Sequence, residues 1–328
     1  MADQGIEETT SHLLLASYGL APELLARFQN GIIYRFVPGQ VCSPADLREE
    51  RVWRGVATRL GQWHATLPVE PATEADTAEH EHIDSSLPSA TLRELPTPAK
   101  INSVTPDKVV PNIWTTMQKW IYALPDDTEA QKARQQQLQS ELIRTVQDLG
   151  NLPGLGYKGL VFGHCDLLSG NVIRIPRSEK SDKDIENVTF IDYEYALPAP
   201  AAFDLANHFS EWGGFDCDYS KLPPTTIRRA FLAQYLDSYS SYKQNSTAVS
   251  KVQALDDLCR AVDTFRGVPG LFWGIWSIIQ SSISQIDFDY AAYAEVRLGE
   301  YFAWRQEQDG TRVREGKVMH PRERRLAD

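Results

Sequence analysis

The sequence predicts an α+β fold, in which two small groups of strands accompany a larger set of helices. Short apolar runs at residues 159–162 and 188–191 have the length of buried strands. Two further strand-like segments, 24–28 and 32–36, are separated by a Gln-Asn-Gly turn that is typical of a β-hairpin. After residue 192, almost all of the chain has helical spacing.

The N-terminal part begins with a predicted helix at residues 6–18. After the hairpin, a second helix is expected to open at residues 43–46, with Ser43 as the N-cap and Asp46 in the first turn. Its apolar face repeats at helical spacing through Val52, Val56, Leu60 and Trp63. We expect His64 to be a packed structural histidine and not a metal ligand, because no second His or Cys stands three or four positions away.

The middle of the chain changes character at residues 69–110, where polar and charged residues dominate and apolar spacing is lost. Such a composition predicts an exposed, disordered insertion. His80 and His82 lie there among acidic residues, so a solvated loop is favoured over a weak metal site. A helical stripe resumes at residues 113–124, and a longer helix, rich in Gln and Glu, is predicted at 127–149.

The C-terminal part is predicted to form helices at residues 224–242, 250–265, 270–284 and 287–304. Between the two central strand-like runs, the charged segment 177–187 is expected to be the exposed tip of a hairpin. The last segment, 312–325, is rich in Arg. A solvated, frayed tail is the preferred interpretation of that segment, with contact to anionic lipid headgroups as the alternative.

The composition is that of an ordinary globular protein of 328 residues, with 42% hydrophobic and 23% charged residues. A net charge of -11 argues against nucleic acid as a partner, because phosphate backbones are bound by basic surfaces. Four scattered Cys without C-x-x-C spacing predict reduced thiols in a cytoplasmic protein. The N-terminus shows no signal-peptide pattern, and the longest apolar run, 268–279, is too short to span a bilayer.

A polar turn after the first central strand carries residues that are suited to phosphoryl transfer. His164, Asp166 and Asn171 have the spacing H-x-D-x-x-x-x-N, and Asp192 follows the second strand. Phosphoryl transfer needs a carboxylate that orients the attacking hydroxyl, and an Asn and a second carboxylate that hold Mg²⁺ on the nucleotide phosphates. We therefore predict Asp166 as the base, Asn171 and Asp192 as magnesium ligands, and His164 as a support for the loop backbone. The alternative is a structural turn, in which Asp and Asn are common for backbone reasons.

Further segments make a family resemblance specific. They are residues 190–196, the run 203–212, and a C-terminal group of Trp273, Trp276, residues 286–289 and Tyr293. Together with the polar turn, these segments resemble the choline/ethanolamine kinase family, whose relatives are the protein kinases and the aminoglycoside phosphotransferases. The resemblance implies a bilobal, protein-kinase-like fold that uses ATP and Mg²⁺. One departure is Cys165, where the family usually has Asn.

The resemblance also implies how the chain is divided. Residues 1–39 would be the remainder of a small lobe with the hinge, and residues 40–328 a large, mainly helical lobe that carries the catalytic loop and the substrate pocket. Glu8 would pair with a phosphate-holding basic residue, and Tyr34 and Phe36 would lie at the hinge that contacts adenine. A glycine-rich hairpin and the strand with that basic residue would precede Glu8, so the chain resembles a member with a truncated N-terminal lobe.

By the same resemblance, one acidic and four aromatic residues would line an amino-alcohol pocket: Glu211, Tyr195, Trp273, Trp276 and Tyr293. On its own, the i, i+3 spacing of the two Trp residues favours packing of both side chains in the protein core. The resemblance implies instead that they line the substrate pocket. Aromatic faces suit the quaternary ammonium of choline, whereas hydrogen-bond acceptors suit the primary ammonium of ethanolamine. Both kinds of group are present, so the residue types leave the choice open. Residues 166–168, 191–196 and 216–220 resemble the ethanolamine-preferring branch.

The predicted function is ATP-dependent phosphorylation of ethanolamine, the first step of phosphatidylethanolamine synthesis. Three alternatives remain beside it: a choline kinase, another small-molecule kinase, and a catalytically impaired relative that acts as a binding partner. The sequence leaves the oligomeric state open, with a homodimer as one outcome.

Overall fold

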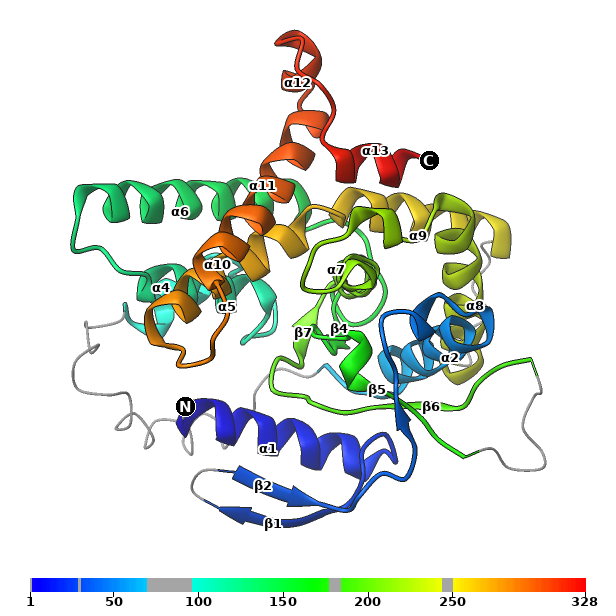
Figure 1. Cartoon of the computed structure of the whole chain (residues 1–328). Helices are drawn as coiled ribbons and strands as arrows, with labels where there is room; N and C mark the ends of the chain where they lie inside the picture. Colours follow the sequence, from blue (N-terminus) through cyan, green and yellow to red (C-terminus); the bar gives the residue numbers. More distant parts are fainter. Residues whose placement is uncertain (1, 29–30, 70–95, 177–183, 244–249) are drawn as a thin grey trace.

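A helix and a two-stranded antiparallel sheet form the N-terminal unit of the structure, a computed structural model (Figure 1). It describes residues 2–28, 31–69, 96–176, 184–243 and 250–328, with side chains from residue 10 onward. Helix α1 (Ala2–Ser17) packs on strands β1 (Leu24–Phe28) and β2 (Gly31–Tyr34). The predicted helix and hairpin are confirmed, and the turn between the strands lies outside the described residues.

Two small antiparallel sheets occupy the centre of the molecule. One has the order β3–β5–β6, formed by Gln40–Val41, Val172–Arg174 and Val188–Phe190. The other pairs β4 (Val161–Gly163) with β7 (Leu197–Ala199). Both predicted central strands exist, but they belong to different sheets. Strands β3, β5 and β7 were not predicted, because two or three residues are too few to show an alternating pattern.

The second helix opens later than predicted. Ser43 donates its N–H and its hydroxyl to Asp46 Oδ2, both at 2.7 Å, and thereby closes one turn of 3₁₀ helix, η1 (Asp46–Arg48). Glu49 is extended, with ψ of 129°, and breaks this turn from helix α2 (Glu50–Thr66). Ser43 and Asp46 therefore bond to each other as the predicted opening signal implies, but Ser43 is not the N-cap of α2; that residue is Glu49.

Helix α2 packs closely against helix α8 (Thr225–Lys243). All four predicted apolar residues of α2 are buried. At the contact stands Gly61, where an added Cβ would lie 2.5 Å from the backbone oxygen of Tyr235. The two helices can therefore approach each other only because Gly61 has no side chain.

The prediction of a disordered insertion at residues 69–110 is wrong for its last part. Residues 98–102 form helix α4 (Pro98–Asn102), and Thr105 and Val109 are buried. Asn112, whose amide donates to Thr105 Oγ1 and Val109 O, ties this segment to helix α5, which it caps. Two buried side chains and one capping residue thus order a segment that is polar on average. Residues 70–95, with His80 and His82, lie outside the described residues.

The remaining helices build the large body around α7 (Ala201–Ser210), whose residues are all buried (Figure 1). The other helices of this body, most of them predicted, are α5 (Ile113–Ala123), α6 (Glu129–Leu149), α9 (Lys251–Phe265), α10 (Val268–Ile283) and α11 (Tyr290–Gln308). Short 3₁₀ turns are η2 (Ser169–Asn171), η3 (Glu211–Gly213) and η4 (Tyr219–Lys221). No helix among the described residues is both long and apolar enough to cross a membrane.

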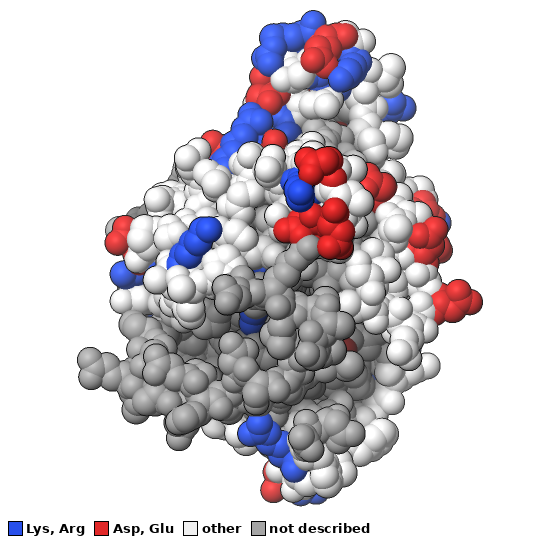
Figure 2. All heavy atoms as spheres, turned by 90° about the vertical axis from the view of Figure 1, so that its left-hand side faces the viewer, with Lys and Arg blue, Asp and Glu red and all other residues white. Residues whose placement is uncertain are grey.

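The prediction of a solvated, frayed C-terminal tail is wrong for its last part, although residues 313–318 are exposed. The segment forms helices α12 (Thr311–Arg314) and α13 (Pro321–Ala327), and α13 packs against α11 and η4. Arg322 and Glu323 are each only 2% exposed, because they pair with buried partners that the sequence pattern does not reveal. On the face shown in Figure 2, basic and acidic side chains intermix at the end that carries α12.

Replacing Gly61 with Ala tests the contact between α2 and α8. The added methyl group would overlap the backbone of α8, so we expect the free energy of unfolding to fall by about 1–3 kcal/mol. Gly299→Ala is the matched control: Gly299 is exposed in α11 with nothing within 4 Å of an added Cβ, so Ala should stabilise by up to about 1 kcal/mol. Urea unfolding measures both values, and an equal change in the two variants would contradict the close packing.

Candidate active site

The loop that follows β4 is held in place by the buried carboxylate of Asp204 on α7. Asp204 accepts the backbone N–H of His164 at 3.0 Å and that of Cys165 at 2.7 Å. Its Oδ2 also lies 2.9 Å from His64 Nε2, so the predicted structural His64 is confirmed as a packed residue that supports this carboxylate. Burial acts to raise the pKa of Asp204, but the hydrogen bonds and charges of its partners outweigh burial and lower it.

Two more residues of α7 fix the same loop. The amide of Asn207 donates to the carbonyl of Cys165 at 2.9 Å, and His208 Nδ1 donates to the carbonyl of Leu167 at 2.8 Å. Cys165 itself has a φ of 62°, which is the left-handed region that side-chain-bearing residues seldom occupy. The carboxylate, the amide and the imidazole of one helix therefore impose the conformation that presents Asp166.

Asp166 points a largely buried carboxylate into the site. Asn171 donates its amide to the backbone oxygen of Asp166 at 2.8 Å and to Asp166 Oδ2 at 3.2 Å, so the structure brings these two predicted residues together. Burial raises the pKa of Asp166 well above its usual range, and the nearby carboxylates of Glu211, Asp192 and Glu194 raise it further. The site therefore concentrates negative charge.

Asp192 lies just beyond β6, exposed, with a φ of 65°. His164 Nε2 donates to the carbonyl of Ile191 at 3.1 Å and thus joins the loop of Asp166 to the loop of Asp192. Burial lowers the pKa of His164, so the ring is neutral and its proton lies on Nε2, facing that carbonyl. Trp63 and Phe190 pack around the ring, with centroid distances of 5.5 and 5.8 Å.

Three of the predicted pocket residues form one aromatic group. The rings of Tyr195, Trp273 and Trp276 meet edge to face, with centroid distances of 5.5 Å from Tyr195 to Trp273 and 5.4 Å between the two indoles. Trp276 Nε1 donates to the Tyr195 hydroxyl at 2.8 Å, and Trp273 Nε1 donates to Asn207 Oδ1 at 2.8 Å. Asn207 therefore connects the aromatic group to the loop of Asp166.

Glu211 and Tyr293 both lie close to Arg297. Glu211 is buried and its Oε1 lies 3.6 Å from an Arg297 nitrogen, while the Tyr293 ring lies 5.8 Å from the guanidinium carbon. Burial raises the pKa of Glu211; Arg297 opposes this shift and Glu300 adds to it. Arg297 was not predicted as a site residue, and its position at i+4 from Tyr293 was the available signal.

Two exposed aromatic residues outside the predicted set contact one of the predicted pocket residues, Tyr293. Phe215 and Phe288 contact each other at 5.9 Å, and both contact Tyr293, at 6.2 and 5.5 Å. Tyr290 connects this pair to Trp276, with centroid distances of 4.9 Å to Phe288 and 5.6 Å to Trp276. Phe288 belongs to the C-terminal motif at residues 286–289, whereas no local pattern pointed to Phe215.

The predicted nucleotide-side residues are less closely connected to this site. Tyr34 contacts His12 at 5.1 Å, and His12 contacts Tyr193, the neighbour of Asp192, at 5.5 Å. Phe36 is 80% exposed. Glu8 lies within α1, but its side chain is outside the described residues. The assignment of these three residues to nucleotide binding stays a prediction.

Two solved structures with a similar fold are those of an ethanolamine kinase and a choline kinase. An ethanolamine kinase of Plasmodium vivax aligns with a TM-score of 0.66 at 22% identity, covering 90% of this chain and 70% of its own. A choline kinase of Cryptosporidium parvum aligns with a TM-score of 0.56 at 19% identity, covering 96% and 80%. At these identities the two structures inform on the fold, and they confirm the predicted protein-kinase-like α+β fold.

Sequence comparisons agree with the fold. The ethanolamine kinase of Drosophila melanogaster is 32% identical over 309 residues, covering 90% of this chain and 50% of its own. Human ethanolamine kinase 1 is 30% identical, covering 94% and 60%, so the chain spans about half to three fifths of the length of these two relatives. A family model described as choline/ethanolamine kinase matches residues 2–302. Because this match takes in nearly the whole chain, the protein belongs to the choline/ethanolamine kinase family.

Proposed function

We propose that the protein transfers the γ-phosphoryl group of ATP to the hydroxyl of ethanolamine and so forms phosphoethanolamine, which enters phosphatidylethanolamine synthesis. The observation that carries the proposal is the buried carboxyl of Asp166, which accepts a hydrogen bond from Asn171 and lies near enough to a second buried carboxyl, Glu211, for that charge to raise its pKa. Membership of the family supports ATP as the phosphoryl donor. The four free cysteines support the expected cytoplasmic location.

Asp166 would orient the attacking hydroxyl. In the transfer, the bond from the substrate oxygen to γ-phosphorus forms, the bond from γ-phosphorus to the β–γ bridging oxygen breaks, and the hydroxyl proton passes to the Asp166 carboxylate. A raised pKa makes that carboxylate a better proton acceptor. The Asn171 amide would hold Asp166 in position for this role, because it donates one hydrogen bond to the carboxylate and another to the backbone oxygen of Asp166.

The donor set next to Asp166 fits a magnesium ion. Mg²⁺ prefers oxygen ligands, and Asp192 offers an exposed carboxylate. The amide nitrogen of Asn171 is occupied by Asp166, which leaves the Asn171 oxygen for a cation. Burial is the main cause of the raised pKa of Asp166, and the neighbouring carboxylates of Glu211, Asp192 and Glu194, which raise it further, supply negative charge that a cation would offset. When bound, Mg²⁺ would neutralise the phosphates, while Asn171 and Asp192 would hold it and His164 would fix the backbone before Asp192.

The pocket offers both kinds of contact that an amino alcohol needs. Ethanolamine carries three N–H donors, and the carboxylate of Glu211 would accept from them. The faces of Tyr195, Trp273, Trp276 and Tyr293 would contribute cation–π contacts. Choline lacks N–H donors and would use only the aromatic contacts, so the presence of buried Glu211 favours ethanolamine. The large aromatic group keeps choline as the second candidate substrate.

A substrate panel tests the proposal directly. The purified chain is incubated with Mg²⁺, ATP and either ethanolamine, choline or an aminoglycoside, and the phosphorylated product is quantified. We expect the highest kcat/KM for ethanolamine. Turnover of the aminoglycoside alone would overturn the proposed substrate, and a higher kcat/KM for choline would exchange the first and second candidates.

Asp166→Asn should lower kcat by about 10²- to 10⁴-fold, because the amide cannot accept the proton. The same change should stabilise the free protein at neutral pH. Folding raises the pKa of Asp166, so the folded state loses stability relative to the unfolded state as pH rises above the ordinary carboxyl range, and the amide removes this penalty. Thermal unfolding without nucleotide or Mg²⁺ measures this gain in stability. Normal turnover by Asp166→Asn would show that Asp166 does not have the proposed role.

Asp192→Asn should raise the Mg²⁺ concentration needed for half-maximal rate by about tenfold or more, because the amide lacks the negative charge of the carboxylate. Asn also enters the left-handed region readily, so the backbone at a φ of 65° should be kept. Rates measured over a Mg²⁺ titration at saturating substrate test this expectation. An unchanged titration midpoint would count against Asp192 as a ligand.

Glu211→Gln and Trp276→Ala should bias substrate choice in opposite directions. Loss of the charged acceptor should raise KM for ethanolamine by about 10- to 100-fold, and that for choline less. Loss of the indole should raise KM for choline by about 2- to 30-fold, and that for ethanolamine less. Steady-state kinetics with both substrates test these expected changes in KM. An equal rise in KM for the two substrates in both variants would mean that the pocket is wrongly assigned.

A further inference from the structure

A row of buried, alternating charges leads from the proposed pocket to the C-terminal helix. Arg297 lies 3.6 Å from Glu211 and 3.5 Å from Glu300, and Arg322 lies 3.7 Å from Glu300. Arg322 also pairs with Glu323 at 2.9 Å. The side chains of Arg297, Glu300 and Arg322 are each 2% exposed, so water does little to screen these charges from one another.

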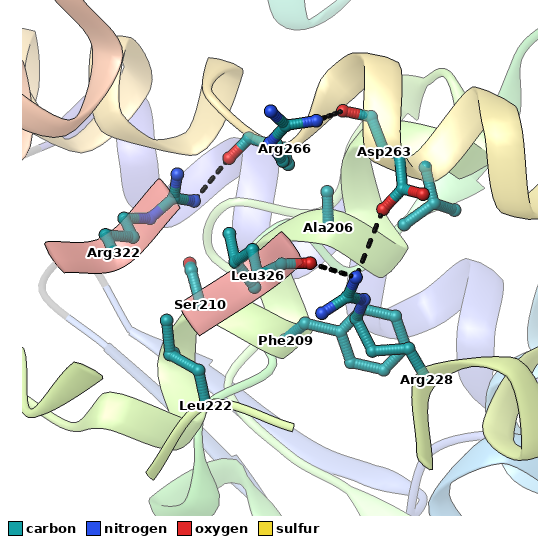
Figure 3. Close-up of a pocket in the computed structure, with 10 residues that line it drawn as sticks. Ala206, Phe209, Ser210, Leu222, Arg228, Asp263, Arg266, Arg322 and Leu326 are labelled. Atoms are coloured by element: carbon teal, nitrogen blue, oxygen red, sulfur yellow. Dashed lines mark hydrogen bonds and ion pairs between the residues drawn. The ribbon is translucent and has the colours of Figure 1, made fainter. Parts of the chain in front are cut away.

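Helix α13 is firmly seated where this row ends (Figure 3). Arg322 donates to the carbonyl of Arg266, and Arg228 donates to the carbonyl of Leu326 at 2.7 Å, so both ends of the short helix are held. The cavity beside Arg228 and Leu326 has a volume of about 10 Å³, room for about one water. The position of Arg322 is therefore fixed by the seat of α13.

The ion pairs in the middle of the row are loose. Glu211 Oε1, Arg297 Nε and Glu300 Oε2 are buried and have no hydrogen bond, only the charge contacts of 3.5–3.7 Å. Arg297 is thus shared between Glu211 and Glu300, and Glu300 is shared between Arg297 and Arg322. If Arg322 lost its charge, Glu300 would attract the Arg297 side chain more strongly than before. The ion pair between Arg297 and Glu211 would then weaken.

We propose that Arg322 is a positioning residue for substrate binding: it compensates the charge of Glu300, so that Arg297 keeps Glu211 ionised and in place for an ammonium group. This inference rests on the proposed function. It assigns a role in the site to a residue that lies beyond residue 302, where the match to the family model ends. Other titratable groups that face the row are Tyr293, Cys217, Tyr219, His320 and Asp166.

Three charge variants test the row. Arg322→Gln should raise KM for ethanolamine by about three- to tenfold, because Arg297 would then hold Glu211 less well in its ionised form and in its position. As the pH is lowered and Glu211 becomes protonated, KM should begin to rise at a higher pH in this variant than in the unchanged protein. Glu300→Gln should leave KM unchanged or lower it, because Arg297 would then form its ion pair with Glu211 alone. The double variant should return KM to within about twofold of the unchanged protein. In all three variants, kcat should change little.

Arg324→Gln is the matched control, because Arg324 is exposed on the same helix and outside the row, and its KM and kcat should be unchanged. If Arg322 only held α13 in place, Glu300→Gln would not rescue Arg322→Gln, and that result would overturn the inference. So would an unchanged KM in folded Arg322→Gln. If Arg322→Gln fails to fold, the double variant still decides: normal KM supports the row, and a raised KM contradicts it. Failure of the proposed function looks different, because then the unchanged protein does not phosphorylate ethanolamine.

Discussion

The hydrogen bonds of Asp204 are the interaction on which the site depends. One buried carboxylate accepts two backbone N–H groups of the loop that carries Asp166, and it is itself oriented by His64. Without that acceptor, each of the two buried donors would lose its partner at a cost of about 1–3 kcal/mol. Asn207 and His208, on the next turn of α7, hold the carbonyls of the same loop. A single helix thus converts a flexible turn into a rigid platform for the reacting groups.

The sequence singled out the proposed reacting residues but not the residues that position them. Asp166, Asn171 and Asp192 were selected because phosphoryl transfer needs such side chains, and their roles stay predictions; the structure brings Asp166 and Asn171 into contact. Asp204 lay within a segment that resembles the family, yet nothing local indicated that its carboxylate would turn back to a loop 40 positions earlier. Contacts of that range depend on how α7 packs, which no short pattern encodes.

Two of the errors in the predicted fold have a common cause. Residues 96–110 and the C-terminal segment were judged from average polarity, which predicts exposure. In the structure, Thr105 and Val109 are buried, and Arg322 is ion-paired with Glu300 and Glu323. Polar residues are buried when their partners are at hand, and the partners of Arg322 include one from a different helix. Long helices were predicted well because their apolar periodicity lies within one segment of the sequence. The partner of a buried polar residue, by contrast, can come from a distant segment.

Two residues of the loops, Cys165 and Asp192, combine a place in the site with a left-handed backbone, at φ values of 62° and 65°. Such positions accept Gly, Asn and Asp most readily and β-branched residues hardly at all. Divergence at both positions is therefore restricted by conformation, and at Asp192 the proposed function adds a restriction by chemistry. A Glu in place of Asp192 would keep the charge but would meet the conformational restriction. Tolerance to mutation along these loops thus follows the backbone angle as much as the reactivity of the side chain.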